Sequence, residues 1–242
     1  IAKIIITATI FNQSFLFDVN GYLKPDIVEQ TFEKIKSHHH VLSSIFQQKD
    51  GKWKQRYELK FKRKECVTFI DLRSHNSQEQ DQIMQEKINQ LQSSLNIESG
   101  DLLKVALFDL SSTEQKLFIV IHHLVIDGVS WRLLVNNFCT IYKCLNNQQP
   151  IVIPQATHTF SFWSDKIHQY ADSTELLNEL SYWRNVANQT TESSLPVDYQ
   201  QGKNTINTAQ SVTSTLDKEK TSALLKEIPK VFDLSLIHIS EP

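Results

Sequence analysis

Two adjacent histidines and an aspartate four residues later form the segment with the clearest capacity for chemistry. The segment reads HHLVIDG over residues 122–128 and follows a run of five apolar residues. Imidazole titrates near neutral pH, which suits it to proton transfer. Neighbouring side chains of a strand point to opposite faces, so the two rings cannot do the same work. We expect one ring to be held in the layer beneath the sheet and the other to face a cavity.

Other readings of the same segment compete with proton transfer. A zinc site would use His123 and Asp127, but side chains four apart converge on a helix, and no third ligand is evident, so no metal is predicted. Ser130 lacks the G-x-S-x-G surroundings of a nucleophile and is expected to bond within the first helical turn. Gly128 is expected to let the chain turn tightly into that helix. The remaining alternative is a structural one, in which one histidine is buried and hydrogen-bonded in the core and the other lies on the surface.

The elements that position these residues follow from the periodicity of the apolar side chains. Residues 117–121 are too uniformly apolar for a strand with one wet face, which predicts a central strand covered on both sides. A helix is predicted from about residue 129 to 145, with Trp131 on its apolar stripe as a packing residue. Further strands are expected at 15–19, 53–61, 66–70 and 102–110, with the basic residues 60–64 as a hairpin end. Further helices are expected from Pro25 and at 78–95, 160–170 and 175–188.

The alternation of strands and helices makes the chain an α/β protein with a sheet covered by helices. In such folds ligand sites gather beyond the carboxyl ends of the strands, which is where the histidine pair falls.

Composition limits the partners and the compartment. The 242 residues include 25 basic and 27 acidic side chains, a net charge of −2 that lacks the basic field required by nucleic acid. No apolar run is long enough to span a bilayer, so no membrane partner is expected. Three cysteines without a CxxC pair fit a reducing compartment. We expect a cytoplasmic, soluble piece of a longer chain, because the first residue is not methionine.

The HHxxxDG pattern at 122–128 resembles the motif of the condensation-domain superfamily of nonribosomal peptide synthetases, whose fold is like chloramphenicol acetyltransferase. The stretch DGVSWR at 127–132 is similar to the DGxSWR form of epimerization domains, and FNQS at 11–14 is similar to a segment of theirs. Aromatic pairs at 162–163 and 182–183 extend the resemblance across roughly residues 11–199.

The resemblance implies a two-lobed enzyme with a tunnel into which a peptidyl carrier domain delivers a substrate on its phosphopantetheine. It implies that His123 is the catalytic acid/base group for converting an L-aminoacyl or peptidyl thioester to the D form, opposite a glutamate of the other lobe. The carrier domain and adjacent synthetase modules are the implied partners, and no cofactor binds the chain directly. Motif-supporting roles are implied for His122, Asp127, Gly128, Ser130, Trp131 and Arg132.

Alternatives to epimerization stay open. In a peptide-bond-forming condensation domain, the same histidine would assist an amine that attacks the thioester. A degenerate carrier-docking or scaffolding domain without chemistry is the other alternative. Its main support is Ser43, which stands where family members often carry an arginine that could pair with Asp127.

The predicted division places the N-terminal lobe at residues 1–188, with a linker and the start of the C-terminal lobe at 189–242. The partner glutamate is expected to lie outside this chain, so the isolated fragment is predicted to be inactive. Residues 234–242 resemble a translated sequencing adaptor, which would make them non-native, and no inference rests on them.

Overall fold

The chain forms two compact units, which are described separately. A computed structural model describes residues 11–57, 66–154, 158–189, 198–199, 201–203 and 205–232. The first unit is Ile1–Ser173 and the second is Thr174–Pro242. The division into lobes at residue 188 stays a prediction.

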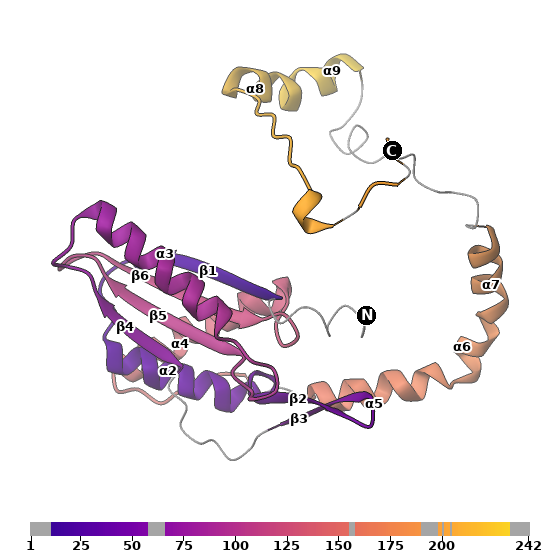
Figure 1. Cartoon of the computed structure of the whole chain (residues 1–242), viewed down its shortest axis with the longest axis horizontal. Helices are drawn as coiled ribbons and strands as arrows, with labels where there is room; N and C mark the ends of the chain where they lie inside the picture. Colours follow the sequence, from indigo (N-terminus) through magenta and orange to yellow (C-terminus); the bar gives the residue numbers. More distant parts are fainter. Residues whose placement is uncertain are drawn as a thin grey trace. The chain divides into compact units, whose positions relative to one another are not determined.

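A four-stranded mixed sheet lies at the centre of the first unit (Figure 1). Its strands follow the order β1-β6-β5-β4, with β5 and β6 in the middle. β6 pairs antiparallel with both β1 and β5, whereas β4 and β5 are parallel. The strands are β1 (Asn12–Asp18), β4 (Val67–Asp71), β5 (Leu103–Asp109) and β6 (Gln115–His122). The central place and near-complete burial of β6 confirm the prediction for residues 117–121.

β1 begins at Asn12 rather than at the predicted residue 15. In the register with β6, Asn12 lies opposite His122. The pairing continues one residue further, because the backbone N–H of His123 donates to the carbonyl of Phe11 at 2.8 Å. Residues 11–14 therefore run alongside the histidine pair.

Helices cover both faces of this sheet, as the apolar pattern predicts. α2 (Pro25–His38) and α4 (Gly128–Asn146) pack together against one face, and α3 (Ser77–Ser93) covers the other. The alternation of side chains along β6 supplies both cores, since Ile119 belongs to the first and Phe118 to the second. The end of β6 is thereby held between two packed layers.

β2 (Ser44–Lys49) and β3 (Lys52–Tyr57) form a separate two-stranded antiparallel sheet. The predicted hairpin between residues 53–61 and 66–70 is therefore wrong, because β3 pairs with β2 and β4 pairs with β5. The turn responsible is Asp50-Gly51, in which both residues have positive φ (53° and 71°), as a two-residue hairpin loop requires. The basic residues 60–64 lie outside the described residues.

The remaining helices follow the sheet in the sequence. They are α5 (Phe160–Ala171) in the first unit, and α6 (Thr174–Asn178), α7 (Leu180–Gln189), α8 (Lys218–Lys226) and α9 (Ile228–Phe232) in the second. The single helix predicted for 175–188 is wrong, since the structure has two helices there, separated at Glu179. In the part of the chain that the structure describes, no helix has the length and apolarity needed to cross a membrane. Residues 190–195 of the predicted linker lie outside the described residues.

Candidate active site

The two histidines at the end of β6 differ sharply in burial. His122 is the last residue of β6 and is 1% exposed, whereas His123 is half-buried. This is the difference that strand alternation predicts for neighbours. Each ring therefore has a separate environment and a separate chemistry.

His122 is a buried ring bound to the backbone of the turn that follows it. Its Nδ1 accepts a hydrogen bond from the backbone N–H of Leu124 at 3.2 Å, so Nδ1 carries no proton. Burial lowers the pKa of His122, and the neighbouring side chain of His123 lowers it further. In the neutral ring the proton is on Nε2, which is buried and has no hydrogen-bond partner among the described residues. These contacts suit His122 to holding the turn rather than to exchanging protons.

His123 is held by three contacts. Its Nδ1 lies 2.8 Å from the carbonyl oxygen of Ile126, and its Nε2 lies 3.0 Å from the amide nitrogen of Gln13. The ring of Phe11 stacks on the imidazole, with centroids 4.7 Å apart and an interplanar angle of 18°. A carbonyl only accepts and an amide nitrogen only donates, so both contacts are satisfied together when Nδ1 carries a proton and Nε2 does not. In that tautomer, Nε2 is the ring nitrogen that has a lone pair able to accept a proton.

Trp131 orients the amide of Gln13. Its indole Nε1 donates to the Oε1 of Gln13 at 2.8 Å. Its ring packs edge-to-face against Phe15, with the ring centroids 4.8 Å apart. The packing role predicted for Trp131 is confirmed, since it is 5% exposed. Its hydrogen bond to Gln13 was not predicted, and it connects the helix α4 to the ring of His123 through one side chain.

Asp127 is the N-cap of α4. Its Oδ1 accepts from the backbone N–H of Ser130 at 2.7 Å, as expected of bonding within the first turn. That hydrogen bond is the main reason that the pKa of Asp127 is lowered. The arginine partner implied by the family resemblance is not found in the described residues, where Asp127 forms no ion pair. Ser43, at the position of that arginine, is buried.

Gly128 does not make the tight turn expected of it. It is the first residue of α4, its φ is not positive, and an added Cβ would meet no atom within 4 Å. The expectation is wrong because Asp127, in an extended conformation, makes the entry into the helix. Gly128 instead lines an open pocket of about 260 Å³ together with Gln13, Ser14, Phe15 and Trp131.

Arg132 lies on the exposed side of α4. It lines an open groove of about 380 Å³ whose other walls are mostly apolar, and no ion pair of Arg132 is found within the described residues. The remaining lining residues are Phe15, Phe17, Trp131, Val135 and Asn136.

Three residues that touch the ring of His123 were missed by the sequence analysis. Phe11 and Gln13 belong to the FNQS segment, which was noted only as a resemblance, and Ile126 lies within the motif itself. Extending the predicted strand back to residue 11 would have placed positions 11 and 13 on one face by alternation. No group of three or more His, Cys, Asp and Glu side chains that could hold a metal ion occurs among the residues described.

Comparison with known sequences identifies the family. The model of the Condensation domain matches residues 2–236. Tyrocidine synthase 2 of Brevibacillus parabrevis is 38% identical over 190 residues, which are 78% of this chain and 5% of that protein. Gramicidin S synthase 1 of Brevibacillus brevis is 35% identical over 224 residues, which are 92% of this chain and 20% of that protein. The chain thus spans a small part of each of these relatives.

Comparison with solved structures agrees. The epimerization domain from the third module of tyrocidine synthetase B superposes with a TM-score of 0.74 at 34% identity, covering 94% of this chain and 51% of that one. The starter condensation domain of rhizomide synthetase gives a TM-score of 0.64 at 16% identity, covering 77% of this chain and 44% of that one, which shows a common fold. The predicted chloramphenicol acetyltransferase-like α/β fold is confirmed. The chain belongs to the condensation-domain family of nonribosomal peptide synthetases.

Proposed function

We propose that the domain containing this chain converts a carrier-bound L-aminoacyl or peptidyl thioester to its D form. The observation that carries the proposal is the 34% identity to a solved epimerization domain over nearly the whole chain. Two condensation domains of the same fold are 16% and 18% identical.

His123 is the proposed acid/base group. Its unprotonated Nε2 takes the α-proton of the substrate, and the electron pair of the broken C–H bond passes into the thioester as an enolate. A second group, which the family resemblance places on a glutamate of the other lobe, returns a proton to the opposite face of the α-carbon. The stereocentre is inverted, and proton exchange with water restores both groups.

The supporting residues act through position. His122 holds the turn after β6, Asp127 and Ser130 hold the first turn of α4, and Trp131 holds Gln13. Gly128 has no conformational need to be glycine, so its missing side chain is proposed to leave room for the tethered substrate beside Gln13.

The proposed partners are a peptidyl carrier domain and the adjacent modules of a synthetase. The phosphopantetheine arm belongs to the carrier, so the chain needs to bind the arm only as part of its substrate. The lobe division at residues 1–188 and 189–242, the inactivity of the isolated chain and the cytoplasmic location stay predictions.

Exchange of the α-proton with solvent tests the proposal. A complete domain containing this chain is incubated in D₂O with a carrier loaded with an L-aminoacyl thioester, and the released amino acid is analysed by mass and by chiral chromatography. We expect deuterium at the α-carbon and a mixture of L and D product. His123→Ala should lower both by about 10² to 10⁴-fold, the usual contribution of general acid–base catalysis.

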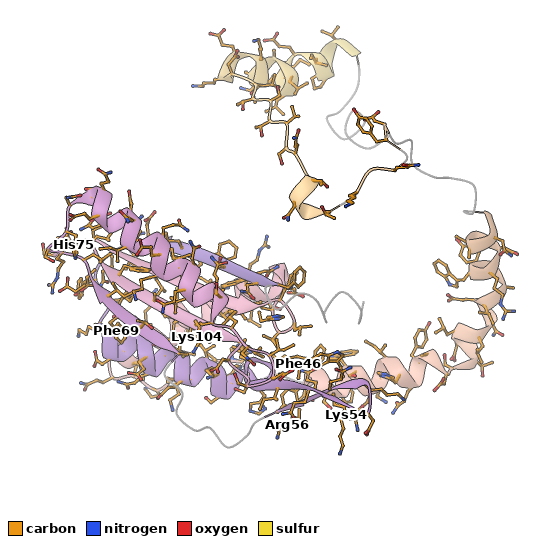
Figure 2. The ribbon with its side chains drawn as sticks, in the orientation of Figure 1. Phe46, Lys54, Arg56, Phe69, His75 and Lys104 are labelled. Carbon is orange, nitrogen blue, oxygen red and sulfur yellow. The ribbon has the colours of Figure 1, made fainter. Side chains whose placement is uncertain are left out.

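The matched control is His75→Ala, the same change on the loop between β4 and α3 (Figure 2). It should leave exchange unchanged. Peptide product from a second, aminoacyl-loaded carrier without deuterium incorporation would show a condensation domain instead. Carrier binding with neither product would show a docking domain.

A further inference from the structure

We propose that Gln13 is a positioning residue that keeps His123 in a single tautomer, with the lone pair of Nε2 free of a proton. The inference deepens the proposed function and rests on it for its catalytic meaning. It assigns Gln13 a role through His123: its amide N–H donates to Nε2 before the substrate arrives and gives up that position to the α-proton.

The polarity of the hydrogen-bond chain through Gln13 is determined at both ends. At one end the indole Nε1 of Trp131 can only donate, and it donates to Oε1 of Gln13 at 2.8 Å. At the other end the carbonyl of Ile126 can only accept, and it lies 2.8 Å from Nδ1 of His123. The link between them, 3.0 Å from the Gln13 amide nitrogen to Nε2, therefore runs from amide to imidazole.

Every other arrangement of these hydrogen bonds places two donors or two acceptors against each other. A reversed Gln13 amide would place its N–H₂ against the indole N–H of Trp131. The opposite tautomer of His123 would place Nε2–H against the amide N–H and the bare Nδ1 against a carbonyl oxygen. Each alternative loses two hydrogen bonds in a half-buried setting, so one tautomer is strongly favoured.

The stacked ring of Phe11 fixes the plane of the imidazole. Phe11 directly precedes β1, and its ring lies against His123. Positions 13 and 15 share one side of β1 by alternation, where Gln13 contacts His123 and Trp131, and Phe15 contacts Trp131. One strand face thus supports both the histidine and the indole that orients Gln13.

The titratable neighbours leave this arrangement undisturbed. His122 is neutral through burial, and the carboxylate of Asp127 is engaged by the backbone N–H of Ser130. The amide N–H of Gln13 consequently occupies the position at Nε2 that the α-proton of the substrate takes in the proposed reaction.

The tautomer can be read directly from the ring nitrogens. The complete domain is labelled with ¹⁵N-histidine, and the His123 signals are assigned by their loss in His123→Ala. Long-range ¹H–¹⁵N spectra at neutral pH should show a protonated Nδ1 and a bare Nε2. A protonated Nε2 with a bare Nδ1 would overturn the inference.

Gln13→Glu should change the protonation of His123 in a predictable direction. A carboxylate accepts hydrogen bonds at both oxygens, so one oxygen still accepts from the indole N–H of Trp131 and the other accepts from Nε2–H of His123. Both ring nitrogens should then be protonated, and α-proton exchange should fall at least 10-fold in kcat with KM little changed. The matched control is Gln47→Glu, opposite Lys54 on the β2–β3 hairpin (Figure 2), which should change neither readout.

Gln13→Met serves where the glutamate variant does not fold, because methionine has similar length and neither donates nor accepts strongly. The carbonyl of Ile126 still favours a proton on Nδ1 in that variant, so we expect the Nδ1–H tautomer to remain the major form, joined by a detectable fraction of the Nε2–H tautomer. Unchanged His123 spectra in both Gln13 variants would refute the positioning role. Spectra as expected, combined with undiminished exchange in His123→Ala, would instead refute the proposed function while the tautomer assignment stood.

Discussion

Replacing His122 by alanine separates the structural histidine from the proposed catalytic one. The His122 ring is 1% exposed, and its Nδ1 satisfies the backbone N–H of Leu124. Truncation removes a fully buried side chain, which typically costs about 2 to 3 kcal/mol. It also leaves the N–H of Leu124 without its acceptor, for about 1 kcal/mol more. We expect the free energy of unfolding to fall by about 3 to 4 kcal/mol, near the upper end for a single substitution.

Two variants divide that loss into its parts. Asparagine at position 122 can place its Oδ1 near the site of Nδ1, so His122→Asn should recover about 1 kcal/mol by accepting from Leu124. His123→Ala removes a half-buried ring with two hydrogen bonds and should cost about 1 to 2 kcal/mol.

Urea unfolding followed by far-ultraviolet circular dichroism measures these differences, and the melting temperature of His122→Ala should fall by about 10 °C. Activity should rank the two alanine variants in the opposite order, since His123→Ala should lose α-proton exchange while it remains folded. Equal stability losses for the two alanine variants, with unchanged rates in both, would refute the assignment of separate roles to the two histidines.

Three further predictions follow from the same contacts. Burial lowers the pKa of both His39 and His122, so on acidification the unfolded chain, whose histidines have a pKa of about 6.5, binds protons that the folded chain excludes. The free energy of unfolding should therefore be full above about pH 6.5 and fall as the pH is lowered. A urea midpoint that rises between pH 6.5 and 5 would contradict this prediction. Asp127→Ala should cost about 1 kcal/mol of unfolding free energy through loss of the α4 cap, whereas Asp127→Asn should retain most of it; equal losses would disprove the capping role. Gly128→Ala should raise the free energy of unfolding by up to about 1 kcal/mol and should slow α-proton exchange by filling the pocket beside Gln13. A destabilised variant would show that the backbone does need glycine there.

Much of the fold could be predicted because it depends on local patterns. The apolar run at 117–121 could be satisfied only by a strand with two covered faces, and the helical spacing of α4 selected its buried stripe. The different burial of His122 and His123 followed from strand alternation alone. These properties need no knowledge of which segment lies next to which.

Pairing and register between distant segments were decided by the tertiary structure. The β2–β3 pairing is local, since Asp50-Gly51 is a turn dipeptide of two-residue hairpins and could have been recognised in the sequence. The parallel pairing of β4 with β5 joins segments that are distant in the sequence, so only the tertiary structure decided it.

The sequence by itself determined the motif, the central strand that carries it and the opposite environments of its two histidines. Only the tertiary structure decided which nitrogen of His123 is bare, because Gln13 lies 110 residues from it along the chain and reaches it through the β1–β6 register. The direction of a hydrogen bond is a property of atoms brought together in space, and a one-residue change of that register would have turned Gln13 to the other face of the sheet.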